Sequence, residues 1–215
     1  MVTKESTGQT FLENAYKLAT PDDNVAYYAA FASMYDMGFA DELGWHYPAA
    51  IAEVYRDACT SGDTPIADVG CGTGLVANAL GCPREQIDGI DISPEMLRIA
   101  DEKELYRKLY EVDLTRALDS IANDYGAVLS AGTFTSGHLG PEPLEALLGI
   151  ARVNALFVIG VNKAFYREAG FEPVLRDLQA RGLIKNLKVA EVLMYEKTGH
   201  VHSADTALAL VYRKS

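Results

Sequence analysis

Cysteine is scarce in this chain, and the few that occur are not spaced for shared chemistry. The 215 residues include three, Cys59, Cys71 and Cys82, with no Cys-x-x-Cys pair among them. We therefore expect neither a disulfide framework nor a cysteine zinc site, and the composition fits a reducing cytoplasm. His200 and His202 have no third ligand nearby in the sequence, so no metal is expected there either.

Long apolar runs are also missing. No stretch approaches the about 18 apolar residues that a membrane-spanning helix needs, and residues 1–17 hold no apolar segment typical of a signal peptide. These absences predict a cytoplasmic protein without membrane contact.

Basic residues are outnumbered by acidic ones. The chain has 19 Lys and Arg against 30 Asp and Glu, a formal net charge of −11. Its densest basic cluster, Arg107-Lys108, is too short to form a patch, so a phosphate backbone would be repelled. Nucleic acid is therefore not expected as a partner.

The periodicity of apolar residues divides the chain into two parts of one expected domain, residues 1–215. Residues 1–60 follow helical spacing, with a break at 21–24, and predict a helical cap or lid. In 61–215 short strands alternate with helices, which predicts a doubly wound, mostly parallel α/β sheet. The strands are expected at 65–69, 87–92, 106–112, 127–130, 155–159, 184–195 and 207–212. Longer helices are expected over 141–153 and 165–181. The last two strands are joined by too short a segment for a helical crossover, so they should pair antiparallel.

The most informative motif directly follows the first expected strand: Asp68-Val69-Gly70-Cys71-Gly72-Thr73-Gly74. Glycines allow a sharp turn and a close approach of a ligand to the backbone, and the helix that follows offers unpaired N–H groups. Asp91 ends the second strand, 21 residues after Gly70, where doubly wound nucleotide sites place an acid against a ribose. The alternatives are a plain strand-to-helix turn and, for Asp91, a helix cap.

Other nucleotide motifs are missing around this loop. A dinucleotide fingerprint requires a third glycine where this chain has Leu75, and no Gly-Lys-Ser/Thr of a phosphate-binding loop is present. Asp68 suits a ligand with an ammonium and a sulfonium group better than a pyrophosphate. The residues favour a positively charged adenosyl ligand.

Three segments in this order, DVGCGTG, GIDISPEMLRIA and EVDL, resemble the class I S-adenosylmethionine-dependent methyltransferases. The resemblance covers the chain from about residue 65 onward. It implies a Rossmann-like, seven-stranded sheet with an antiparallel final hairpin. It also implies methyltransferase activity, with S-adenosylmethionine as cofactor and S-adenosylhomocysteine as product.

The resemblance also implies roles for individual residues. The glycine loop would line methionine and ribose, Asp91 would bind the ribose hydroxyls, and adenine would lie beside Ile92, Met96 and Asp113. The implied cofactor-binding set is Asp68, Gly70, Cys71, Gly72, Thr73, Gly74, Asp91, Ile92, Met96, Asp113, Leu114, Ser130 and Ala131, with Gly132 beside the methyl-transfer region. Met96 is equally suited to ordinary core packing, and Asp113 to capping a helix that begins near Leu114.

A polar segment, 132–141, follows the fourth expected strand, at the edge where open sheets place ligands. His138 is a candidate general base, because its ordinary pKa lies near neutrality; otherwise it caps the next helix or bonds the loop backbone. Thr133 and Thr135 are candidate substrate contacts. With the later GVN and FYREAGF segments, this stretch more loosely resembles the Williams–Beuren region methyltransferase-like group.

Aromatic residues gather in the expected cap. Tyr35-Asp36 resembles the Tyr-Asp of many small-molecule methyltransferases, and we expect Tyr28, Tyr35 and Trp45 near the substrate pocket, under a lid that closes over the donor. The alternative is that these aromatic residues only pack in the core.

The sequence thus predicts methyl transfer to an O, N or C atom of a small molecule by a monomer or homodimer. The Asn/Asp-Pro-Pro-aromatic motif of nucleic-acid amino-methyltransferases is absent. Alternatives are protein or RNA methylation, a non-catalytic protein that binds an adenosyl ligand, and a nicotinamide-binding oxidoreductase.

Overall fold

A seven-stranded sheet forms the centre of the computed structural model, which describes residues 7–15, 17–18, 20–200 and 202–215. The strand order is β3-β2-β1-β4-β5-β7-β6. The strands are β1 (Ile66–Val69), β2 (Ile87–Asp91), β3 (Lys108–Glu111), β4 (Tyr125–Phe134), β5 (Ala151–Asn162), β6 (Ile184–Leu193) and β7 (Thr206–Lys214). The first five run parallel, and β7 is antiparallel to both neighbours. The predicted doubly wound sheet and its antiparallel hairpin are confirmed.

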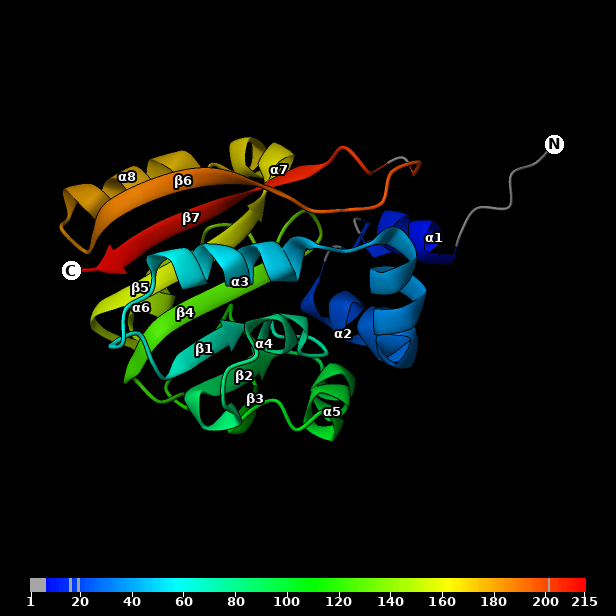
Figure 1. Ribbon diagram of the computed structural model, residues 1–215. Helices are drawn as coiled ribbons and strands as arrows, with labels where there is room; N and C mark the ends of the chain where they lie inside the picture. The colour runs from blue at the N-terminus through cyan, green and yellow to red at the C-terminus, as the bar shows by residue number, and fades with distance from the viewer. Residues whose placement is uncertain (1–6, 16, 19, 201) are drawn as a thin grey trace.

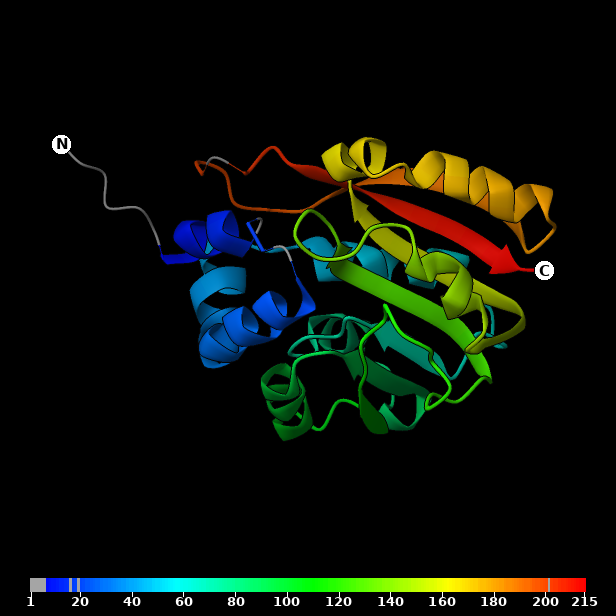
Figure 2. The same ribbon diagram turned by 180° about the vertical axis from the view of Figure 1, so that it is seen from behind.

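Helices cover both faces of this sheet. The helices from residue 47 onward are α3 (Tyr47–Ala58), α4 (Leu75–Leu80), α5 (Pro94–Glu102), α6 (Pro143–Leu148), α7 (Lys163–Glu168) and α8 (Phe171–Ala180). One buried cluster joins α3, α4 and α5 to the sheet, and a second joins α6 and α8 to its other face. Figure 1 shows α3 and α4 in front of the sheet, and the turned view of Figure 2 brings α6 and α8 forward.

The N-terminal elements gather beyond the ends of the parallel strands (Figure 1). They are α1 (Thr7–Ala15), α2 (Pro21–Phe31), the 3₁₀ helix η1 (Ala32–Met34) and the π-helix η2 (Tyr35–Asp41), which we call the cap. Thr20 accepts a hydrogen bond from the Asp23 backbone and Asp23 returns one, a capping box that begins α2 at Pro21. The sequence break at 21–24 is therefore the start of a helix. Within the described ranges, no helix is long and apolar enough to cross a membrane.

Two expected helices are wrong in extent. The helix expected over 141–153 ends at Leu148, because Gly149 closes it and Ala151 already pairs with Tyr125 in the sheet. The apolar residue Val153 misled the prediction, since it is 69% exposed on β5. The helix expected over 165–181 is two helices, α7 and α8, separated at Gly170, whose φ of +75° is left-handed.

Strand β4 is longer than the expected 127–130 and ends at Phe134. Its pairing with β5 is irregular between Ser130 and Phe134, so Gly132 and Thr133 lie in a distorted strand end and not in a loop. Strand β3, in turn, is shorter than the expected 106–112. The distortion of β4 turns the strand end toward the loop that follows β1.

Candidate functional site

The loop after β1 leaves open space above its backbone. Gly70 and Gly72 have φ of +68° and +52°. A Cβ at Gly70 would lie 1.8 Å from Thr133 Oγ1, whereas a Cβ at Gly72 would meet nothing within 4 Å. Gly70 is therefore required for packing against β4, and Gly72 exposes its backbone to whatever lies beside the loop.

Asp91, at the end of β2, is hydrogen-bonded to this loop. Its Oδ2 accepts a hydrogen bond from Gly72 N at 2.8 Å, and its Oδ1 accepts one from Ser93 N at 2.9 Å. Burial raises the pKa of Asp91, against the lowering effect of these hydrogen bonds. Each carboxylate oxygen keeps a further lone pair, so Asp91 can still accept hydrogen bonds from ligand hydroxyls.

A cavity lies between the glycine loop, the ends of β2 and β3, and the cap; we call it the glycine-loop cavity. Its walls combine apolar side chains with the carboxylates of Asp91 and Asp113. Of the predicted site residues, the structure brings together at this cavity Gly70, Gly72, Asp91, Ile92, Met96, Asp113, Leu114, Ala131, Tyr28, Tyr35, Thr133 and His138. Gly132, predicted beside the methyl-transfer region, also lines it, and the remaining lining residues are Thr20, Asn24, Ser93, Val112, Thr115 and Leu139.

Asp113 caps a turn and not a helix. Its Oδ1 accepts hydrogen bonds from Thr115 N at 2.9 Å and from Thr115 Oγ1 at 2.6 Å, and Arg116 Nε lies 3.2 Å from Oδ2. Burial alone would raise the pKa of Asp113, but the hydrogen bonds from Thr115 and the charge of Arg116 hold it below its ordinary value. Asp113 therefore remains a hydrogen-bond acceptor at one end of the cavity.

Five predicted cofactor contacts do not line the cavity. The Asp68 carboxylate accepts a hydrogen bond from Tyr106 Oη at 2.7 Å, and burial raises its pKa to about 7. The other four are Cys71, Thr73, Gly74 and Ser130, of which Ser130 Oγ donates to Val69 O at 2.7 Å.

A smaller cavity, which we call the aromatic cavity, adjoins the first. The two share Tyr28, Tyr35, Gly132 and His138. The other lining residues of the aromatic cavity are Phe11, Ala15, Trp45, Tyr47, Phe134, Thr135, Asn162 and Met194. The predicted substrate residues therefore fall at one or both cavities.

The aromatic residues of the cap pack on one another and on the body of the fold. Ring centroids of Tyr28 and Tyr35 are 6.1 Å apart, and both rings contact Phe11. Trp45 forms an isolated bridge with Tyr195, their rings 5.0 Å apart. Core packing and cavity lining, which the sequence presented as alternatives, thus coexist in these side chains.

Polar contacts that the sequence did not reveal fasten the cap to the site. Asp36 Oδ1 accepts a hydrogen bond from Thr73 Oγ1 at 2.6 Å, and Asp36 Oδ2 pairs with Lys103. Lys103 Nζ also donates to Thr73 O at 2.7 Å. Asn24 Nδ2 donates to Gly137 O at 2.9 Å. The Tyr35-Asp36 motif was a usable signal for Asp36, but no sequence pattern marks Lys103 or Asn24.

His138 points to the cap and not to the helix after it. Its Nε2 lies 2.8 Å from Tyr28 Oη, and its Nδ1 lies 3.3 Å from Ser136 O. Burial lowers the pKa of His138, partly offset by the Ser136 contact. The loop-backbone interaction is therefore present, together with access to both cavities.

The two later histidines do not form a ligand cluster. His202 Nδ1 pairs with Asp205 at 2.8 Å, and the His200 ring packs edge-on against Tyr195. In the described part of the chain, no three His, Cys, Asp or Glu side chains are grouped so that they could hold a metal ion.

Comparison with known proteins identifies the family. Residues 66–154 match the family model described as "Methyltransferase domain". Over residues 66–154, the chain carries a class I, S-adenosylmethionine-dependent methyltransferase domain. It is therefore an enzyme, and its methyl donor is S-adenosylmethionine. Among curated proteins, none matches the chain.

Solved structures share the fold of this methyltransferase at low sequence identity. A TehB-like S-adenosylmethionine-dependent methyltransferase from Corynebacterium glutamicum is 19% identical, with a TM-score of 0.57, over 91% of this chain and 100% of that one. A Haloferax volcanii protein solved in complex with the methyltransferase activator Trm112 is 18% identical, with a TM-score of 0.61, over 87% and 98%. A structure concerned with the conversion of a disulfide bond into a thioacetal group in echinomycin biosynthesis is 20% identical, with a TM-score of 0.56, over 81% and 84%. The looser resemblance to the Williams–Beuren group stays a prediction.

Proposed function

We propose that this enzyme transfers a methyl group to an O, N or C atom of a small molecule held in the aromatic cavity. The observation that carries the proposal is the sharing of Tyr28, Tyr35, Gly132 and His138 between the two cavities. A molecule in the aromatic cavity would therefore lie beside one in the glycine-loop cavity, and such alignment supplies much of the rate of a transfer reaction.

The glycine-loop cavity has groups that suit the donor. Asp91 would accept hydrogen bonds from the ribose hydroxyls, and Ile92 and Met96 would flank adenine, with Asp113 near its amino group. The backbone of Gly70 and Gly72 would contact the methionyl part. When bound, S-adenosylmethionine supplies a methyl group on a positively charged sulfonium, which is already activated toward a nucleophile.

The aromatic cavity favours a small acceptor with few charges. Its walls come from α1, α2 and η2 on one side and from β4 and β5 on the other. Among the described lining residues, no Asp, Glu, Lys or Arg faces this cavity. A macromolecule would have to displace the cap to reach it, and the net charge of −11 is unfavourable for a nucleic acid.

The structural neighbours bear on the choice of acceptor. One neighbour's structure concerns echinomycin biosynthesis, which agrees with a small-molecule acceptor. Methylation of protein or RNA is the second candidate, and because another neighbour was solved with the methyltransferase activator Trm112, dependence on a partner is tested with it. A non-catalytic role would show as donor binding without turnover on any acceptor.

A cavity-filling variant tests the proposal. Ala15 is 3% exposed and lines the aromatic cavity only, so Ala15→Leu should fill the acceptor space and leave the donor space open. Purified protein is incubated with S-adenosylmethionine and a library of small phenols, amines and carbon acids, and S-adenosylhomocysteine formation is measured. We expect turnover by wild type, a loss of at least about tenfold in Ala15→Leu, and unchanged donor affinity.

The matched control is Ala26→Leu, which adds the same side chain at an exposed position of α2. It should behave as wild type. Transfer of radiolabel only to macromolecules in a lysate, with no small acceptor methylated, would contradict the proposal and favour the second candidate.

A further inference from the structure

The hydrogen bonds of His138 determine its tautomer. Ser136 O can only accept, so the contact at 3.3 Å places a proton on His138 Nδ1. The other ring nitrogen, Nε2, then carries a lone pair in the neutral ring and accepts the hydrogen bond from Tyr28 Oη at 2.8 Å. Nε2 is therefore occupied by Tyr28, and an acceptor would meet the Tyr28 hydroxyl in front of it.

His138 is chemically distinct among the residues around the aromatic cavity. Of the described side chains that line it, His138 is the one that can take up a proton near neutral pH. Burial lowers its pKa, so the ring is neutral and able to accept. The titratable groups that face it are Tyr28 and Tyr35 from the cap and, across the glycine-loop cavity, Asp91 and Asp113.

We infer that Tyr28 and His138 form a proton relay, in which the Tyr28 hydroxyl receives the proton of an acceptor O–H or N–H and passes its own proton to His138 Nε2. This inference rests on the proposed small-molecule function. Tyr28 is the catalytic residue of the pair, and His138 is the positioning residue that acts through it.

The proton movements balance within these groups. The O–H or N–H bond of the acceptor breaks and a new O–H bond forms on Tyr28, while the original Tyr28 O–H bond breaks and an N–H bond forms on His138. The electron pair left on the acceptor atom is the pair that forms its bond to the methyl group, and the pair of the broken carbon–sulfur bond stays on sulfur. The imidazolium carries the positive charge until His138 releases its proton to solvent.

A structural role alone would also place these two side chains together, since α2 is fastened nearby by Asn24 and Gly137. The two roles differ in their pH dependence. A relay requires neutral His138, so turnover should rise with pH through the pKa of His138 and level off near neutrality. If the hydrogen bond between Tyr28 and His138 only held the cap in place, turnover would not follow the ionisation of His138.

Three variants test the relay: Tyr28→Phe, His138→Gln and the double variant. Gln can accept the Tyr28 hydrogen bond but cannot take the proton. Each single variant should lose about 100-fold in kcat, with donor affinity nearly unchanged. The kcat of the double variant should be no lower than that of the slower single variant, as expected for groups that act as a unit. The rise of turnover with pH should disappear in all three. Tyr27→Phe is the matched control, because its hydroxyl bonds Phe11 O at 2.8 Å and lines neither cavity.

Nitrogen NMR of His138 in the free protein gives a readout that does not need an acceptor. Wild type should show a protonated Nδ1 and an unprotonated Nε2, and Tyr28→Phe should raise the pKa of His138, because the neutral ring loses its hydrogen bond. A protonated Nε2 in neutral wild type, or a Tyr28→Phe variant with the turnover and pH profile of wild type, would overturn the relay. Donor binding without turnover of any small acceptor by wild type would instead overturn the proposed function.

Discussion

Two aspartates, Asp63 just before β1 and Asp68 within it, show how differently the two ends of the sheet are built. Asp63, before the strand, is 3% exposed, and its carboxylate accepts hydrogen bonds from both Arg213 Nη atoms at 2.8 and 3.0 Å and from Thr60 N at 2.7 Å. Burial alone would raise its pKa, but these partners hold the pKa below the ordinary value. Asp68, near the end of the strand, is 0% exposed and has one described partner, Tyr106, so burial raises its pKa to about 7.

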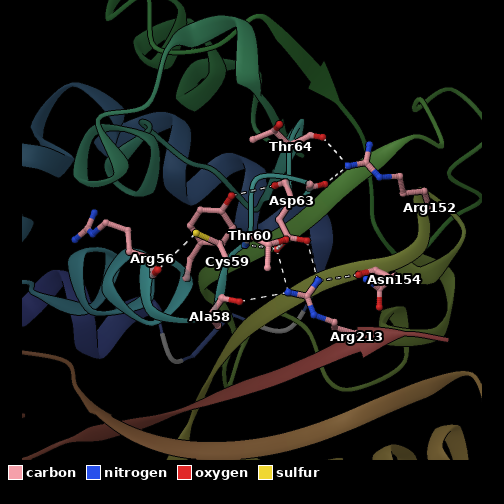
Figure 3. A network of polar contacts seen from close by, with 11 residues as sticks. Arg56, Ala58, Cys59, Thr60, Asp63, Thr64, Arg152, Asn154 and Arg213 are labelled. Carbon is pink, nitrogen blue, oxygen red and sulfur yellow. Dashed lines mark hydrogen bonds and ion pairs between the residues drawn. The ribbon is translucent and has the colours of Figure 1, made fainter.

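The neighbouring contacts follow the same division. Figure 3 shows the amino end, where Arg213 on β7 and Arg152 on β5 reach the segment before β1. At the carboxyl end, Asp68 Oδ1 and Asn24 Oδ1 are buried without a hydrogen-bond partner among the described residues. Charged pairs therefore stabilise the amino end, whereas at the carboxyl end Asn24 Oδ1, which belongs to a residue lining the glycine-loop cavity, can still accept a hydrogen bond, as is typical of a ligand site.

The largest expected effect is at the amino end. Arg213→Met leaves the Asp63 carboxylate buried without its partner, which should lower the free energy of unfolding by about 3–5 kcal/mol. Denaturant titration measures this, and Arg176→Met, at an exposed pair with Glu172, should change it by less than about 0.5 kcal/mol. Equal effects of the two variants would show that the amino end carries no special stability.

The pKa of Asp68 is shifted in the opposite direction to that of Asp63, so Asp68 should make the protein less stable as the pH rises. Its folded pKa of about 7 lies above the ordinary 3.8, so the unfolded chain ionises first and stability should fall as the pH rises from about 4 to 7. Asp68→Asn should remove that part of the slope, worth at least about 1.4 kcal/mol for one pKa unit. Unfolding midpoints from pH 4 to 8 measure it, and identical slopes in both proteins would contradict the assignment.

Asp91 should matter for the donor more than for the fold. Asp91→Ala removes the carboxylate that bonds Gly72 and faces the glycine-loop cavity, so affinity for S-adenosylhomocysteine should fall by more than tenfold, about 1.4 kcal/mol or more. Fluorescence or calorimetric titration measures the affinity. An unchanged value would remove Asp91 from the donor site.

The smallest effect is expected where the cap meets the glycine loop. Asp36→Asn weakens the ion pair with Lys103, whose partly exposed charges are screened by solvent. Donor affinity should fall by at most about fivefold, or about 1 kcal/mol, and the difference should shrink at high salt. A loss that is the same at low and high salt would show that the contact acts by shape and not by charge.

The strand pattern was easier to predict than the ends of the elements. Buried runs such as 65–69 and 87–92 are recognised because both faces of a parallel strand are covered. The helix predicted over 141–153 was too long because three exposed residues near the start of β5, 152–154, interrupt the apolar pattern of that strand. The division into a cap and a core remains a prediction of the sequence.

In the site, the residues that could be predicted are those that belong to local sequence motifs. Gly70, Gly72 and Asp91 come to the cavity because the carboxyl ends of adjacent parallel strands meet there. The pairing of Tyr28 with His138 joins residues 110 positions apart, and that of Lys103 with Asp36 joins residues 67 apart. No local pattern records such contacts, since they depend on how the cap folds back.

The most direct test of the central claim, that the carboxyl end of the sheet binds the adenosyl donor, is a calorimetric titration of wild-type protein. S-adenosylmethionine, S-adenosylhomocysteine and NADH are each titrated under the same conditions. We predict binding of the two adenosyl ligands with a Kd on the order of micromolar and no binding of NADH. Binding of NADH alone, or of none of the three, would contradict the account of the glycine loop and Asp91.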